Sequence, residues 1–223
     1  MPDGQYSFYL HSDDRTDIAA MATISTISQP LRGEFIRTAA TAGAVVYQVD
    51  ARLPALIPVF FDGQLSAIRL CAVMALVSGT WSSLSGLPDE PDGGVAALVM
   101  SPETKYQRRR YTLTLQNDRS GERVESVLTE ASSRLRGDLL RNLIITGLAL
   151  HTTAPELPRL LASMPVPPTS VSELQALVQQ MAGTADVNRA AAAVPDTPAA
   201  SAAPVSGSDT REIKKNMRRA FGD

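Results

Sequence analysis

The sequence is poor in the residue types on which most catalytic and metal sites depend. It contains one cysteine and two histidines, so it can form no internal disulfide and offers few imidazoles. His11 and His151 occupy non-equivalent positions and belong to no metal-ligand or nucleophile pattern. Gly93 and Gly94 lack the strand, the lysine and the helix of a phosphate-binding loop. We therefore expect no enzyme activity, no metal and no cofactor.

The sequence also lacks a segment that could direct it into a membrane or out of the cell. Its longest apolar run is interrupted by Arg69 and closed by Gly79, which makes it too short to span a bilayer. No charged-then-apolar leader opens the chain. The single Cys71 lies in this run, where a buried and inert thiol is expected. These features predict a soluble protein of the reducing cytoplasm.

Neither sign of charge is in large excess, because the formal net charge is −2. The distribution is nevertheless uneven. Residues 106–183 hold nine Lys and Arg against seven Asp and Glu, and residues 209–223 hold five against three. Positive charge gathered in these two places would act through local contacts more than through a long-range field.

What the sequence does contain is an internal duplication. The segment Leu31–Arg37 returns as Leu135–Arg141, and the same offset of 104 carries Gly43 onto Gly147. A repeat of this kind governs the fold and is considered before any local pattern. It predicts two units, with residues 1–84 as the first, 85–105 as a linker and 106–183 as the second. Because each unit is small, its core is marginal and mutual packing or dimerisation is expected.

Alternating polar and apolar residues precede each copy, at 5–11 and at 110–116, with an offset of 105. Alternation with a period of two predicts a strand that has one apolar face. The side chains expected on the inward face are Tyr6, Phe8, Leu10, Tyr111, Leu113 and Leu115. A lone strand can neither bond its backbone nor bury that face. We therefore expect the strands of the two units to pair antiparallel.

Each strand is followed by about four helices, so the predicted fold is mainly α. Ser28 is expected to cap the second helix of the first unit, with Pro30 in its first turn, and Ser132 or Ser133 the second helix of the other unit. Gly43 lies in the middle of the first of these helices, where glycine costs about 1 kcal/mol relative to alanine. Its repetition predicts a close helix–helix approach.

The end of the chain divides into a tether and a short helix. Residues 184–208 are almost wholly Ala, Pro, Ser, Thr and Val, which cannot build a core, so a disordered linker is expected. In residues 209–223 an apolar stripe with i, i+4 and i+8 spacing is flanked by basic residues. This predicts a helix that becomes ordered on a partner. The residues expected to contact that partner are Ile213, Lys214, Met217, Arg218 and Phe221.

A two-stranded antiparallel ribbon fits the major groove of B-DNA, where its outward side chains reach base edges. The residues expected to contact bases are Gln5, Ser7, Tyr9, Arg110, Thr112 and Thr114. The second helices would present free N–H groups to flanking phosphates. The residues expected there are Ser28, Arg32, Gly33, Ser132 and Arg136. Any one of these residues, taken singly, is more simply explained as a solvated polar side chain. Because the same set of positions occurs in both units, the set as a whole favours DNA binding.

The same segments resemble a known family. The segments that carry the resemblance are Phe8-Tyr9-Leu10-His11, Arg32–Ala40, Ala42-Gly43 and Asp50–Pro54. They resemble the ParR / StbB plasmid stability family of ribbon-helix-helix proteins. The resemblance implies a centromere-binding adaptor of an actin-type plasmid partition system. It implies binding to direct repeats in double-stranded DNA, self-association into a curved array, and capture of a ParM-like ATPase filament by the tail. Members usually have one unit, whereas this chain has two.

Several questions stay open at the level of sequence. The units could pair within one chain, as a covalent pseudo-dimer with two different half-sites, or each with its own kind in another chain. The protein could instead be a ribbon-helix-helix transcriptional repressor, or an antitoxin whose tail binds a toxin or another protein. A membrane is disfavoured as partner, because three acidic residues share the tail.

Overall fold

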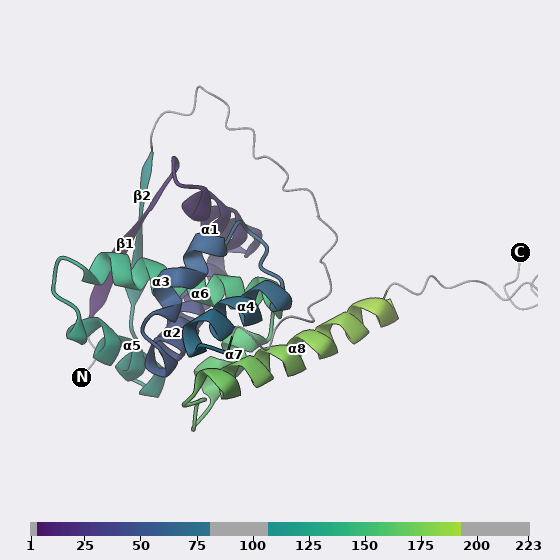
Figure 1. Cartoon of the computed structure of the whole chain (residues 1–223). Helices are drawn as coiled ribbons and strands as arrows, with labels where there is room; N and C mark the ends of the chain where they lie inside the picture. The colour runs from purple at the N-terminus through teal and green to yellow at the C-terminus, as the bar shows by residue number, and fades with distance from the viewer. Residues whose placement is uncertain (1–3, 81–106, 193–223) are drawn as a thin grey trace, which may run out of the picture. The chain divides into compact units, whose positions relative to one another are not determined.

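The structure is a computed structural model that describes residues 4–80 and 107–192 (Figure 1). In these residues each repeat has one strand followed by four α-helices. The first repeat comprises β1 (Gln5–His11), α1 (Arg15–Thr26), the 3₁₀ helix η1 (Gln29–Leu31), α2 (Arg32–Val49), α3 (Leu53–Phe60) and α4 (Ala67–Ser78). The second comprises β2 (Arg108–Thr114), α5 (Arg119–Glu130), α6 (Arg136–Thr153), α7 (Leu157–Ser163) and α8 (Val171–Ala192).

Strands β1 and β2 form a two-stranded antiparallel ribbon within the chain. Phe8 pairs with Tyr111, and their rings stack with centroids 5.3 Å apart. The side chains of the inward face that are fully or almost fully buried are Phe8, Leu10, Leu113 and Leu115. The predicted mainly α fold, with one ribbon built from both repeats, is confirmed. Of the two pairings left open, this structure contains the one within a single chain.

The ribbon has an internal pseudo-twofold relation. Ser7 pairs with Thr112, which is its own counterpart at the offset of 105. The neighbouring pairs, Gln5 with Thr114 and Tyr9 with Arg110, exchange under the same relation. A pseudo-twofold axis therefore passes between Ser7 and Thr112 and relates one repeat to the other.

Helices α2 and α6 cross at the centre of the shared core (Figure 1). A methyl group on Gly43 would overlap the backbone carbonyl of Leu143, and one on Gly147 would overlap that of Ala39. These contacts are the same contact seen from the two repeats, because Ala39 and Leu143 are counterparts at the offset of 104. The predicted close helix–helix approach is confirmed, and it requires glycine at both positions.

A buried ion pair joins the repeats on one side only. Asp17, which is fully buried, accepts from Arg141 Nε at 2.6 Å and from the backbone N–H of His11 at 2.8 Å. Burial raises the pKa of the Asp17 carboxyl, and these two hydrogen bonds partly oppose that rise. The counterpart of Asp17 is Gly121, where any side chain would meet the Gln116 carbonyl. The ion pair therefore has no copy across the pseudo-axis.

The predicted capping by serine side chains is wrong, although Ser28 occupies the N-cap position of η1 and Pro30 lies in its first turn. Ser28 precedes η1 and makes no capping hydrogen bond with its side chain, and α2 starts only at Arg32. Likewise α6 begins at Arg136, after Leu135, and Ser132 accepts through its backbone carbonyl. Each of these two helices is preceded by a tight turn in which a backbone oxygen accepts the hydrogen bond, so the serine hydroxyls are not needed.

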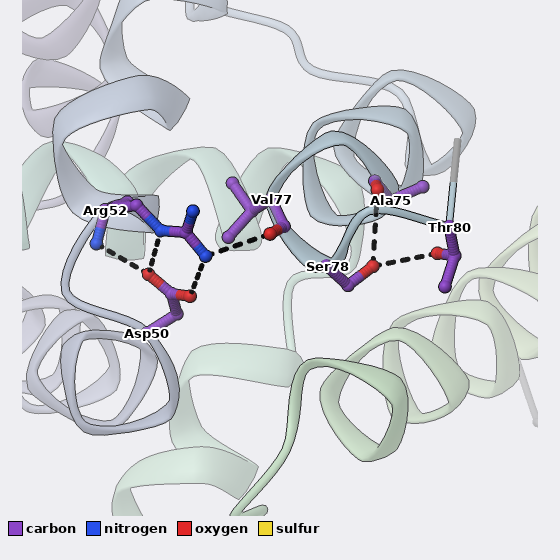
Figure 2. Close-up of polar contacts among 6 residues, drawn as sticks. All are labelled: Asp50, Arg52, Ala75, Val77, Ser78 and Thr80. Atoms are coloured by element: carbon purple, nitrogen blue, oxygen red, sulfur yellow. Dashed lines mark hydrogen bonds and ion pairs between the residues drawn. The ribbon is translucent and has the colours of Figure 1, made fainter. Parts of the chain in front are cut away.

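The fourth helices of the two repeats end differently. In the first repeat Arg52 pairs with Asp50 at 2.7 Å and also donates to the Val77 carbonyl at 2.9 Å, near the end of α4 (Figure 2). Gly79 then closes α4 with a φ of 74°, in the left-handed region. The counterparts of Asp50 and Arg52 are an alanine and a glutamate, which cannot form this arrangement.

Helix α8 instead continues through Gly183 to Ala192. The prediction of a linker from residue 184 is therefore wrong for residues 184–192, where alanines favour continuation of a helix. The predicted linker at 85–105 and the tail at 209–223 lie outside the described residues.

We expect Gly43→Ala to lower the free energy of unfolding by about 1–3 kcal/mol, because the added methyl group forces α2 and α6 apart. Gly33→Ala is the matched control, since a Cβ there meets nothing within 4 Å, and it should stabilise the protein by up to about 1 kcal/mol. Urea unfolding of both variants tests this. Equal midpoints would contradict the close crossing.

Candidate nucleic-acid interface

The outward face of the ribbon carries all six residues predicted to contact bases. Pairing and burial place them opposite the buried side chains of the same strands. The members of this face are Gln5, Ser7, Tyr9, Arg110, Thr112 and Thr114. Four of the six are exposed, while Ser7 and Tyr9 are partly covered. The structure thus brings together polar side chains that lie more than 90 residues apart in the sequence.

The two partly buried residues of this face, Ser7 and Tyr9, are each covered by an arginine. Arg110 donates to the Ser7 hydroxyl from Nη2 at 2.9 Å and from Nε at 3.2 Å. The Arg108 guanidinium lies 3.5 Å from the centroid of the Tyr9 ring, a cation–π geometry. Both side chains therefore lie along the ribbon surface, with the remaining N–H groups of Arg110 available to a ligand.

Arg108 was not among the residues predicted from sequence. It belongs to the same face, because β2 begins at this residue and pairs it with His11. Extending the alternation of Thr114, Thr112 and Arg110 by two more residues would have found it.

The flanks of the ribbon are unlike. Beside the Arg108 end is a shallow depression lined by both charge signs. Its carboxylates are Asp13, Asp14, Asp17 and Asp138, and it also contains Tyr9, His11, Arg108, Arg141 and Asn142. At the other end Arg37, the counterpart of Arg141, donates to the Thr114 carbonyl at 3.4 Å. One flank thus has an arginine engaged by carboxylates, and the other has an arginine engaged only by a backbone oxygen in the contacts of the described residues.

The arginines predicted to contact phosphates also have a structural task. Arg32 donates to the Ile27 carbonyl at 2.8 Å and to the Ser25 carbonyl at 3.2 Å. Arg136 donates to the Ala131 carbonyl at 3.2 Å, the corresponding contact in the second repeat. Each guanidinium thus holds the C-terminal end of the preceding helix, where carbonyls lack intrahelical donors. A phosphate would have to be bound by the N–H groups that remain.

The N-terminal turns of α2 and α6 have some features that suit the binding of an anion and others that oppose it. Gly33 faces open space, and a Cβ at Gly137 would lie 3.5 Å from the Ser7 carbonyl oxygen, so the start of α6 adjoins the ribbon. Ser28 and Ser132 are exposed. However, the first turns also carry Glu34 and Asp138, which already satisfy the preference of a helix N-terminus for negative charge. The outward face of the ribbon is therefore the stronger part of the candidate interface.

A family model described as plasmid stability protein matches the chain twice, over residues 4–74 and 109–178. The chain belongs to the plasmid stability protein family. The two matches coincide with the two repeats, which confirms the tandem duplication, and the family indicates a role in plasmid maintenance. No curated protein and no solved structure matches the chain significantly.

Within residues 4–80 and 107–192 no group of His, Cys, Asp and Glu side chains could bind a metal ion. His151 lies edge-on to the Phe35 ring and has Nδ1 3.2 Å from the Pro155 carbonyl oxygen. In the described ranges every helix is too short or too polar to span a bilayer. The predicted tail contacts at Ile213, Lys214, Met217, Arg218 and Phe221 are outside those ranges.

We expect Arg32→Ala to lower the free energy of unfolding by about 1 kcal/mol or more, because two helix-end carbonyls lose a charged donor. Arg136→Ala removes one such contact and should cost less. Arg134→Ala, at an exposed neighbouring position, is the control. Urea unfolding measures all three, and an Arg32→Ala variant as stable as Arg134→Ala would contradict the structural role.

Proposed function

We propose that this plasmid stability protein is a partition adaptor that binds DNA through its ribbon and a polymer through its tail. The ribbon enters the major groove of directly repeated, centromere-like sites. The C-terminal segment at 209–223 links the bound DNA to an actin-like, ParM-type filament. The observation that carries the proposal is the outward face of the ribbon, where polar side chains from both repeats point away from a common core.

The geometry of the ribbon supports DNA as its ligand. A two-stranded antiparallel ribbon has the width of the major groove, which displays a distinct pattern of donors and acceptors for each base pair. Arg110 suits the O6 and N7 atoms of guanine, Gln5 suits adenine, and the threonines offer both a hydroxyl and a methyl group. Each repeat contributes one strand to the pair, and helices follow that strand, which is the order expected of a ribbon-helix-helix protein.

The remaining parts of the proposal rest on family membership and on the composition of the tail. Several copies bound to adjacent repeats would self-associate into an array that displays many tails. Each tail combines the apolar stripe of Ile213, Met217 and Phe221 with basic residues, as suits a helix that folds on a protein partner. In this proposal the protein is a cytoplasmic adaptor that performs no catalysis and holds no cofactor.

We expect Arg110→Ala to weaken binding to a preferred duplex about 5- to 150-fold, the range of one bidentate base contact, with a smaller effect on random duplex. Thr112→Ala should act in the same direction. Arg109→Ala is the matched control, because this exposed arginine of the same strand lies toward Tyr111 on the inward side. Fluorescence anisotropy on both duplexes measures the effect. Equal losses on both would refute base reading.

We expect Phe221→Ala in the full chain to abolish co-sedimentation with filaments of the actin-like ATPase from the same plasmid, while DNA affinity stays unchanged. The stripe would lose its largest apolar contact without any change in the ribbon. Lys215→Ala, which lies outside the predicted contact residues, is the control. Retained co-sedimentation would refute the filament contact, and capture of a toxin by the intact tail would favour the repressor or antitoxin function.

A further inference from the structure

One chain contains a complete ribbon. Both strands of the described sheet, the crossing of α2 with α6 and the Asp17–Arg141 ion pair are all formed between the two repeats of a single polypeptide. A second chain is not needed to bury the inward face or to pair the strand backbones. The outward face is therefore a single recognition surface, and both of its strands belong to the same chain.

The side chains of this recognition surface do not obey the pseudo-twofold symmetry, although its backbone does. The pseudo-twofold relation brings Gln5 onto Arg110, Ser7 onto Thr112 and Tyr9 onto Thr114. All three pairs differ in residue type. Arginine reads guanine through O6 and N7, whereas glutamine reads adenine through N6 and N7. Two identical DNA half-sites would thus meet different side chains.

The flanks reinforce the difference. The end that carries Arg108 and Arg110 adjoins the depression with Asp13, Asp14 and Asp138, and there Arg141 is held by Asp14 at 3.2 Å as well as by Asp17. The opposite end has Arg37 beside Thr114. Carboxylates repel the phosphate backbone and arginines attract it. Backbone contacts, like base contacts, would therefore differ between the two halves.

We propose that each chain binds a non-palindromic DNA site in one fixed orientation, with Arg108 and Arg110 over a guanine-containing half-site. This inference rests on the proposed DNA-binding function and adds the polarity of the complex. On directly repeated sites successive chains then point the same way. Each C-terminal segment follows the second repeat of its chain, and the second repeat lies over the same half of every site. The bound array therefore has a direction.

The experiment uses two cysteine variants at counterpart positions of the full chain. Gln29→Cys and Ser133→Cys lie in the equivalent, exposed turns before α2 and α6, whereas the native Cys71 is only 4% exposed. A preferred duplex is first selected from a randomised library with the unmodified protein. An iron chelate attached to each cysteine then cleaves the DNA nearby, and protein treated with reagent but lacking the new cysteine is the control.

We expect an enriched sequence without twofold symmetry, with cleavage by the Gln29→Cys conjugate on one side of the site and by the Ser133→Cys conjugate on the other. A palindromic sequence, or equal cleavage on both sides by each conjugate, would overturn the fixed orientation and leave DNA binding intact. Failure to enrich any sequence would instead overturn the proposed DNA-reading function itself.

A second variant tests the assignment of the arginine end. Gln5→Arg places an arginine at the position related to Arg110, on an exposed residue where folding is not at risk. It should raise affinity at least about tenfold for a duplex whose guanine-containing half-site is duplicated in inverted orientation. On that duplex the cleavage by either conjugate should become two-sided. No gain in affinity would overturn the assignment of Arg110 to guanine.

Discussion

Strands β1 and β2 can form ladder hydrogen bonds only with each other, because the sheet in the described residues contains no third strand. Their apolar faces cover the helices of both repeats, so neither repeat can bury its inward residues alone. Phe8 and Leu113, counterparts in the two strands, are both almost fully buried in the common core. The two repeats are thus obliged to fold together, and the outward face of the ribbon follows from that pairing.

The glycine crossing serves the same requirement. Gly43 and Gly147 let α2 and α6 approach until backbone touches backbone. The Asp17–Arg141 ion pair adds a contact that only one side can make, since Gly121 leaves no room for a carboxylate. Removal of one partner of a buried pair costs more than the pair contributes, because a charge stays desolvated. The asymmetry is therefore built into the interior as well as the surface.

Much of this arrangement was predictable from the sequence because it depends on local periodicity and on duplication. Alternation alone placed Phe8 inward and Ser7 outward, and the repeated glycine predicted the helix crossing. The contacts that escaped prediction depend on tertiary structure. Arg141 meets Asp17 across 124 residues, and Arg32 turns back to the end of α1 instead of facing outward. The prediction of serine side-chain caps was wrong because backbone carbonyls accept the hydrogen bonds in those turns. The preference of serine for the N-cap position does not determine whether its hydroxyl or a backbone carbonyl is the acceptor.

Under the proposed DNA-binding function, the joining of both strands in one polypeptide has a consequence for how recognition would change over evolution. In a homodimer every substitution in the strand appears twice, so both half-sites must change together for binding to survive. Here the replacement of Gln5 or Thr114 alters one end and leaves Arg110 and Tyr9 as they were. Mutation would therefore alter the preference for one half-site at a time, and dilution of the protein would not separate the two halves.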